Sequence, residues 1–202
     1  MLSWALLAYG YAFRDADPDL ALEALRRGLV IAQDSGNRFN ETILVYTLSG
    51  LEAEQGDRMA ALDSFTVAIH NYHESGNAYM VSAPLALLAV FLDRLGHYES
   101  AGTIAGFAAV NPLTAALPEL DAAIGHLREV LGDQTYQSLA REGGAMTTAA
   151  IVSYAYDQID QARAELSARP HLRQSPVYRR RTGSPGLSSL KSLPQKYTTD
   201  MT

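Results

Sequence analysis

The segment from Asp17 to Asn37, DPDLALEALRRGLVIAQDSGN, indicates the fold class, because the chain repeats its pattern 40 residues later. The second copy runs from Asp57 to Asn77 as DRMAALDSFTVAIHNYHESGN and aligns with the first without a gap. A third, shorter copy, HYESAGTIAGFA, begins at His97, again 40 residues further on. A fixed period of this length is typical of helical repeat proteins, in which each unit stacks on the next.

Three positions in the copies alternate between small and larger side chains. A small residue is followed after four positions by a generally larger one, and after three more by another small one. Residues three and four apart are neighbours on one face of a helix, so this spacing predicts a close packing seam between paired helices. The aligned positions are Ala21, Ala61 and Ala101, then Leu25, Phe65 and Ala105, then Gly28, Ala68 and Ala108.

Helix start and stop signals agree with the repeat. Asp17 and Asp57 are placed to cap helices, and Pro18 suits the first helical position because its missing N–H would be unpaired there. Gly36 and Gly76 predict helix ends in the left-handed conformation. Each unit is therefore predicted to be a helical hairpin, and the apolar-rich first helices of the three hairpins are expected at Leu2–Phe13, Glu41–Gln55 and Tyr79–Leu95.

The second copy resembles a known repeat family. Ala61, Phe65 and Ala68 resemble the Ala, Phe and Ala of the second helix of a tetratricopeptide repeat, and the first copy matches more loosely. The period departs from the usual length of about 34 residues for that repeat. The longer unit is similar to the helical repeats of large bacterial ATPase regulators of the MalT and LuxR type, including actinobacterial regulators fused to adenylate cyclase domains.

The segment after the third copy, Leu117 to Ile159, resembles the terminal helices of the same regulators. It contains an Arg-bearing amphipathic helix, a Leu-Gly break, an aromatic-bearing helix, a Gly-Gly pair at Gly143 and Gly144 that we expect to form a turn, and an Ala-rich helix. The resemblance covers about residues 2–165. It implies an all-α, right-handed tetratricopeptide-like solenoid with three hairpins in residues 1–110 and capping helices in residues 111–166.

The charge is divided unevenly between the body and the end of the chain. Residues 1–166 hold nine Arg and 21 acidic residues, a net charge of −12, whereas residues 167–202 hold seven basic residues and one acid. The acidic body disfavours direct nucleic-acid binding, which needs Lys and Arg at the phosphates. The Ser, Pro and Gly content of residues 167–202 predicts a disordered basic tail. Its YRRRTGSP stretch also fits binding to an acidic surface or nucleic acid, and the change of composition also fits an altered reading frame.

Composition removes several kinds of chemistry. The chain has no Cys, so disulfides, thiolate metal sites and cysteine nucleophiles are excluded. It has no Gly-Lys pair, which a phosphate-binding loop of an ATPase would require. Without a nucleophile and base, a metal set or a cofactor loop, we expect no enzyme and no cofactor. The apolar opening from Met1 to Phe13 is too short to span a bilayer and lacks preceding basic residues, so we expect a cytoplasmic protein that does not enter a membrane.

Two local patterns suggest metal binding and are better explained otherwise. Asp15, Asp17 and Asp19 alternate as in a calcium loop, but the Gly and Glu that such a loop needs further on are absent, which favours helix capping. His70 and His73 stand three apart on an expected helix, but no third ligand converges on them, which favours surface histidines. The sequence therefore predicts no metal site.

These observations predict a non-catalytic protein-interaction or sensor arm of, or derived from, a bacterial ATPase-type transcription regulator. Its partner would be another protein or the ATPase module of the regulator. The alternative is a small-ligand module, since the resemblance implies that related arms can bind inducers. An enclosed pocket with converging polar groups would favour the small ligand, and an open groove would favour a peptide.

The resemblance also predicts which residues form the binding surfaces of this arm. In tetratricopeptide arrays the first helix of each pair lines the inner groove, which gives the groove prediction Leu6, Phe13, Ile43, Tyr46, Val90 and Asp93. The alternative is that these side chains belong to the core. Trp4 and Leu7 lie on other faces of the first helix, where we expect self-association or docking on another protein.

Overall fold

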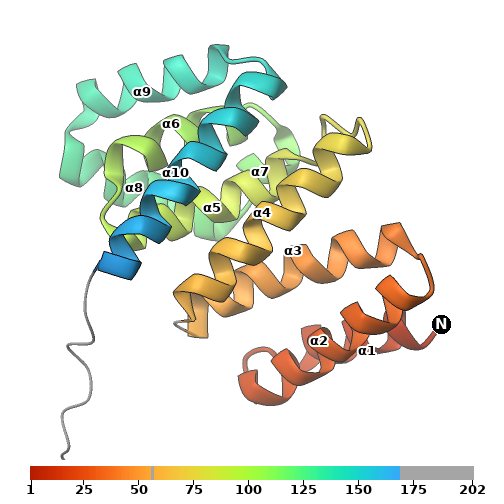
Figure 1. The fold of residues 1–202 in the computed structure, drawn as a ribbon. Helices are drawn as coiled ribbons and strands as arrows, with labels where there is room; N and C mark the ends of the chain where they lie inside the picture. Colours follow the sequence, from red (N-terminus) through yellow and green to blue (C-terminus); the bar gives the residue numbers. More distant parts are fainter. Residues whose placement is uncertain (56, 169–202) are drawn as a thin grey trace, which may run out of the picture. The chain divides into compact units, whose positions relative to one another are not determined.

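The computed structural model describes residues 1–55 and 57–168, and this part of the chain forms ten α-helices (Figure 1). The predicted all-α class is confirmed. All but the first two residues of the predicted basic tail lie outside the described residues. The helices are α1 (Leu2–Phe13), α2 (Pro18–Asp34), α3 (Arg38–Gln55), α4 (Arg58–Glu74), α5 (Ser82–Leu95), α6 (Tyr98–Ala108), α7 (Pro112–Ala115), α8 (Pro118–Leu131), α9 (Asp133–Ala145) and α10 (Thr148–Ala168).

The first six helices pack as sequential pairs, α1 on α2, α3 on α4 and α5 on α6 (Figure 1). The small-large-small seam predicted from the repeat is buried at all nine positions. Gly28 illustrates why a small residue is needed there, since a Cβ on it would lie 3.1 Å from Leu44 and 3.2 Å from Leu6. The register of the 40-residue repeat is therefore confirmed as a packing pattern.

The predicted helix ends are also confirmed. The side chains of Asp17 and Asp57 each accept a hydrogen bond from the backbone N–H three residues further on, at 3.1 and 3.2 Å. Gly36 and Gly76 have φ values of +66° and +68°, in the left-handed region that glycine adopts without a Cβ clash. The recurring Ser-Gly-Asn sequence is thus a helix stop.

The prediction of a turn at Gly143 and Gly144 is wrong, because α9 continues through both residues to Ala145. The physical reason is close packing rather than chain reversal. A Cβ on Gly143 would collide with the backbone carbonyl oxygen of Thr103 in α6, and a Cβ on Gly106 would collide with the backbone of Ala140 in α9. The glycines allow the backbones of α6 and α9 to approach each other directly.

The core forms two clusters. The first joins α1, α2 and α3, and the second joins α4 to the helices that follow it, including α10, which lies against α4 and α6 (Figure 1). The first cluster contains Leu7, Ala21, Leu22, Leu25, Ala32, Leu44, Leu48 and Leu51. Large members of the second include Phe65, Ile69, Leu85, Leu88, Leu92, Ile104, Leu120, Leu127, Ile151 and Ile159.

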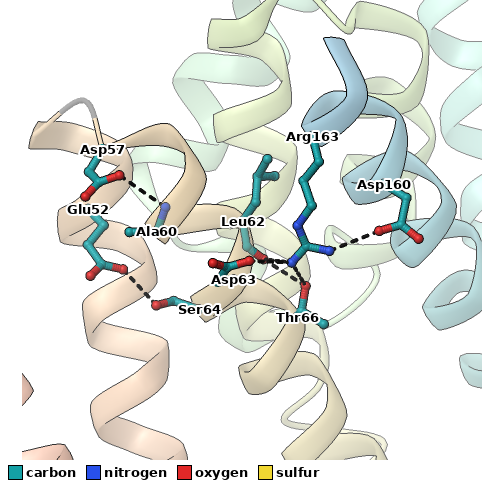
Figure 2. A network of polar contacts seen from close by, with 9 residues as sticks. All are labelled: Glu52, Asp57, Ala60, Leu62, Asp63, Ser64, Thr66, Asp160 and Arg163. Atoms are coloured by element: carbon teal, nitrogen blue, oxygen red, sulfur yellow. Dashed lines mark hydrogen bonds and ion pairs between the residues drawn. The ribbon is translucent and has the colours of Figure 1, made fainter. Parts of the chain in front are cut away.

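Polar contacts hold α4 to its neighbours on both sides (Figure 2). Glu52, in α3, is only 4% exposed. Its carboxylate accepts hydrogen bonds from Arg26 at 2.9 Å and from Ser64 at 2.7 Å. A buried carboxylate needs such donors, because its desolvation is otherwise costly. Glu52 therefore joins α2, α3 and α4.

Arg163 makes the corresponding link from α10 to α4. Its guanidinium donates to Asp63 at 2.8 Å, to Thr66 Oγ1 at 2.9 Å and to the carbonyl oxygen of Leu62 at 3.3 Å (Figure 2). Asp160, one turn earlier in α10, accepts a further hydrogen bond at 3.0 Å. The planar guanidinium can serve several acceptors at once, which a lysine could not do in the same geometry.

None of the helices within residues 1–55 and 57–168 has both the length and the apolar character that a bilayer crossing requires.

Candidate functional site

An open groove, here called the inner groove, runs along α1, α3 and α5 to the start of α8. Its first hollow has a volume of about 190 Å³ and lies between α1, α3 and the start of α8. A second hollow lies between α5 and α8 and a third between α3 and α5, and all three share Glu119. The groove is lined by Tyr11, Arg14, Tyr46, Thr47, Gly50, Glu54, Leu87, Val90, Arg94, Leu117 and Glu119, among others.

Four aromatic side chains of α1 and α3 are here called the aromatic quartet: Trp4, Tyr11, Phe39 and Tyr46. Trp4 and Phe39 stack with ring centres 6.4 Å apart and planes at 16°, and they are 51% and 68% exposed. Tyr11 and Tyr46 line the first hollow. Each tyrosine follows the first aromatic of its helix by seven residues, which places it about 10.5 Å further along the same face. The quartet is thus one stacked ring pair, Trp4 and Phe39, followed by two tyrosines that border the same hollow.

Tyr46 is the most enclosed member of the quartet. Burial raises its pKa from 10.0 to about 12, and the neighbouring Tyr11, Tyr72 and Glu119 add to the shift. The shift reflects how closely the ring is enclosed. The phenol is protonated at neutral pH, as tyrosine ordinarily is, and its hydroxyl can donate a hydrogen bond.

Charged side chains border the groove beyond the quartet. Within the described part of the chain, Glu54, Glu119 and Arg94 form no ion pair, whereas Arg14 lies 3.5 Å from Asp15. Glu119 is half-buried and Glu54 is exposed. At the first hollow, where Glu54 and Glu119 stand with Arg14 alone, the carboxylates favour a ligand that carries positive charge, whereas Arg94 offsets them at the other two hollows.

The structure brings only some of the predicted groove residues together. Tyr46, Val90 and Asp93 line the hollows, although α8 packs over part of α5 there and Asp93 accepts a hydrogen bond from His126 Nδ1 at 2.8 Å. Ile43 is half-buried against the first core cluster.

Two of the predicted groove residues face elsewhere. The Cβ of Leu6 lies beside Gly28 of α2, and the ring of Phe13 stacks on Tyr9 at 4.4 Å. Both side chains are half-buried, Leu6 beside α2 and Phe13 against the first core cluster, and neither lines the hollows.

The two residues predicted to self-associate differ in exposure. Leu7 is 5% exposed and belongs to the first core cluster, so it holds α1 in place and is not free to meet a partner. Trp4 is half exposed, as a contact residue should be, but it stacks on Phe39 of α3.

The sequence reasoning missed Tyr11, Phe39, Glu54 and Glu119. The first two were detectable, because an aromatic residue stands seven positions from another in both α1 and α3. Glu119 was not detectable in this way, because its place depends on the return of α8 to the groove.

Three of the five residues considered for metal binding have other neighbours. Asp17 caps α2, Asp15 lies beside Arg14, and His73 lies 3.9 Å from Glu74. Over residues 1–55 and 57–168, no group of three or more His, Asp or Glu side chains is arranged to hold an ion.

No protein-family model matches the chain, and no curated protein or solved structure is significantly similar to it. The fold and the groove define it as an all-helical protein of sequentially packed pairs with an open, partly aromatic surface.

Proposed function

We propose that this chain is a non-catalytic protein-interaction arm that binds a peptide segment of its partner in the inner groove. The observation that supports this most directly is the aromatic quartet, since Trp4 and Phe39 are 51% and 68% exposed on α1 and α3, and Tyr11, 45% exposed, lines the first hollow. Exposed clusters of aromatic side chains commonly mark interaction sites, and Trp and Tyr are enriched among the residues that dominate binding energy.

The dimensions of the groove favour a peptide over a small ligand. Small-ligand sites usually occupy about 300–1,000 Å³ and enclose most of the ligand. The hollow at Tyr11 and Tyr46 has a volume of about 190 Å³. The larger hollow along α5 and α8, about 440 Å³, is more open to solvent. A ligand that extends along the groove fits these hollows better than a compact one.

We propose that the helix pairs are tetratricopeptide-like and that the arm belongs to, or derives from, a bacterial ATPase-type transcription regulator. The buried seam at Ala61, Phe65 and Ala68 supports the first part, because these positions carry the resemblance. The helices after the third pair support the second part, because their order resembles the terminal helices of such regulators.

The test is a selection of random peptides by display on the full chain, repeated with a groove variant that combines Tyr11→Ser and Glu54→Lys. Both side chains are exposed, so the variant should fold. We expect peptides that bind the parent chain and lose binding to the groove variant. Failure to enrich any peptide, or equal binding to parent and variant, would contradict the proposed function.

A matched control variant combines Tyr9→Ser with Glu23→Lys. Tyr9 is 40% exposed on another flank of α1, and Glu23 is exposed on α2. Neither residue lines the three hollows of the groove. The control makes the same chemical changes as the groove variant, so selected peptides should bind it as they bind the parent.

A further inference from the structure

Helix α1 is apolar on every side but is covered on only one. Apart from the four-residue α7, it is the one helix in residues 1–55 and 57–168 without a charged side chain. It packs mainly on α2, and seven of its twelve residues are exposed. A helix that is apolar all round is normally buried, as most of α5 is. We infer that a second copy of this chain covers α1, with the two α1 helices packed antiparallel.

The exposed face of α1, here called the alanine face, spans about half of the helix circumference. Successive residues of a helix are rotated by about 100°. Small side chains therefore form a row along the middle of the face, and larger side chains stand along both edges. The row is Ala5, Ala8 and Ala12, one edge is Trp4 and Tyr11, and the other edge is Leu2 and Tyr9. Small residues in the middle allow a second helix axis to approach to about 8 Å, so that the edges can pack on its flanks.

Charge favours a second copy over other occupants. The alanine face carries no charge, whereas residues 1–166 carry a net charge of −12. Two acidic chains can therefore meet at this face without placing like charges in contact. A membrane is a poor occupant, because its anionic surface would repel the acidic body and α1 offers no Lys or Arg to offset the repulsion. A charged peptide would gain no ion pair there.

The alanine face is also complementary to itself. In an antiparallel pair related by a twofold axis at Ala8, each edge lies opposite the same edge of the other copy. Trp4 stands four residues before Ala8 and Tyr11 three residues after it, so each ring meets the other kind from the second copy, within about 1.5 Å along the helix axis. The alanine rows meet in the same way, with Ala5 opposite Ala12. A closed twofold dimer requires such self-complementary contacts.

The charge at the ends of α1 favours the antiparallel direction. Residues 14–19 follow its C-terminal end and hold three Asp and one Arg, a net charge of −2. In a parallel pair these segments of the two copies would approach each other and repel. In the antiparallel pair each lies beside the N-terminal end of the other α1, where unpaired backbone N–H groups carry partial positive charge.

The uncovered area is large enough for a dimer. Trp4, Tyr9 and Tyr11 are 51%, 40% and 45% exposed, and Phe39, which stacks on Trp4, is 68% exposed. At about 150–250 Å² for a whole aromatic residue, these rings offer about 400 Å² per copy. The aliphatic side chains of the face bring this to roughly 600 Å². Two copies would bury about 1,200 Å², the lower limit of specific interfaces, so the dimer should be reversible.

This contact is separate from the proposed peptide site. The three alanines of the row line none of the three hollows of the inner groove, and neither do Trp4 and Phe39. A peptide confined to the hollows would leave these two rings uncovered, whereas the second copy covers them. Tyr11 borders both surfaces.

Cysteine cross-linking tests the contact directly, because the chain contains no Cys. Ala8→Cys is compared with Ala164→Cys, at an exposed alanine of α10, in the full chain treated with oxidised glutathione. We expect at least about tenfold more covalent dimer from Ala8→Cys, because a disulfide requires close Cα atoms. A mixture of Ala5→Cys and Ala12→Cys should form mainly the mixed dimer, because the antiparallel pair places these positions opposite each other.

Sedimentation of the chain without added cysteines measures the reversible dimer. We expect the parent to shift from monomer to dimer as its concentration rises to about 100 μM. Ala8→Arg should weaken the dimer at least about tenfold, because the contact would bury an unpaired charge. Ala164→Arg makes the same change outside the contact and should leave the dimer within about twofold. Circular dichroism checks that both variants keep their helices.

Salt provides a further test of the occupant. Raising NaCl from about 50 to about 500 mM should strengthen the dimer or leave it unchanged, because salt screens the repulsion between the acidic bodies. A dimer that salt weakens about tenfold would be held by opposite charges at another surface, and the inference would be wrong.

Other results would also overturn the inference. A parent that stays monomeric at about 100 μM would do so, including one that binds anionic vesicles instead. Equal cross-linking at Ala8 and Ala164, or an unchanged dimer in Ala8→Arg, would exclude the alanine face as the contact. Disulfide dimers of Ala5→Cys with itself would overturn the antiparallel direction.

The peptide display distinguishes failure of the dimer from failure of the proposed function. Ala8 lines no hollow of the groove, so Ala8→Arg should bind the selected peptides as the parent does. If the parent is monomeric and the display still enriches groove peptides, the dimer is wrong and the proposed function stands. If the parent dimerises through Ala8 and no peptide is enriched, the dimer stands and the proposed function is wrong.

Discussion

The α1/α3 face and the α6/α9 interface are built in opposite ways. On the first, the large rings of Trp4 and Phe39 stack on each other and lie at the surface. In the second, Gly143 and Gly106 bring two helix backbones into direct contact. Large exposed side chains provide contact area for a partner, whereas glycines at a helix crossing provide close approach within the protein. We therefore expect function to be sensitive at the first region and stability at the second.

The glycines of α9 support this division energetically. A glycine inside a helix costs roughly 1 kcal/mol relative to alanine, because it loses more backbone freedom on folding. Residues Gly143 and Gly144 lie in the last turn of α9, where this cost must be offset by packing. The close approach of α6 and α9 supplies the offset.

Gly143→Ala should have the largest effect on stability. Its new Cβ would collide with the backbone oxygen of Thr103, which cannot rotate away as a side chain can. The helices must separate, and we expect a loss of about 3 kcal/mol or more, at the upper end of overpacking effects. Urea denaturation followed by circular dichroism measures this change.

The matched control is Gly125→Ala in α8. A Cβ there would meet no atom within 4 Å. We expect no loss, or a gain of about 0.5–1 kcal/mol from the reduced freedom of the unfolded chain. If Gly143→Ala behaved in the same way, the α6/α9 interface would not depend on close backbone contact.

The second prediction is that the repeat seam does not accept larger side chains. Ala61 and Ala101 are completely buried at equivalent positions of α4 and α6. Replacing either by Leu should cost about 1–3 kcal/mol, because extra methylene groups force a packed core apart. The cost should be smaller than at Gly143, where the obstacle is backbone. If both variants were as stable as the parent, the predicted close packing at the seam would be wrong.

The seam, the caps and the helix stops could be predicted because they depend on residues close in sequence. Asp17 and Gly36 act on their own helices, and the repeat itself fixed the register of Ala61. The α6/α9 contact could not be predicted, because a Gly-Gly pair has the same local preference whether it turns or packs.

The candidate site was predictable only in part for the same reason. Tyr46 was placed on the groove by the repeat register, and the structure brings it there. Leu6 is on α1 as predicted but faces Gly28, because the rotation of a terminal helix depends on its neighbours. Glu119 reaches the groove only through the path of α8, which no local pattern specifies.

The third prediction tests how far Tyr46 belongs to the core. The raised pKa means that the folded state resists ionisation of the phenol. Below pH 10 the phenol is protonated in both states, so its full contribution to stability is present. Between about pH 10 and 12 only the unfolded state ionises, so stability should fall by up to about 2 kcal/mol. Tyr46→Phe should reduce this alkaline loss, measured by denaturation at several pH values. An unchanged loss would place Tyr46 with the exposed members of the quartet.

The fourth prediction concerns the attachment of α10. Arg163→Met removes the hydrogen bonds to Asp63, Thr66 and the carbonyl of Leu62 but keeps most of the aliphatic stem. The side chain is 26% exposed, so solvent screens the ion pair and the expected loss is about 1 kcal/mol. A double-mutant cycle with Asp63→Asn should recover part of that loss as coupling between the two residues. Additive effects would show that the ion pair with Asp63 contributes nothing, and that the loss comes from the hydrogen bonds to Thr66 and Leu62.

The smallest effect on stability is expected at Trp4, and its size tests whether the α1/α3 face is a surface or part of the core. Trp4 is half exposed and contacts Phe39, which is itself mostly exposed, so Trp4→Ser removes little buried area. We expect a loss of at most about 0.5 kcal/mol, as for other surface substitutions. The same variant should reduce any self-association seen in sedimentation, because a large exposed ring supplies contact area between molecules. Phe39→Ser, at the other half of the same pair, should behave alike in both measurements. A loss of several kcal/mol in either variant would mean that the aromatic quartet belongs to the core and that the α1/α3 face is not a surface reserved for binding.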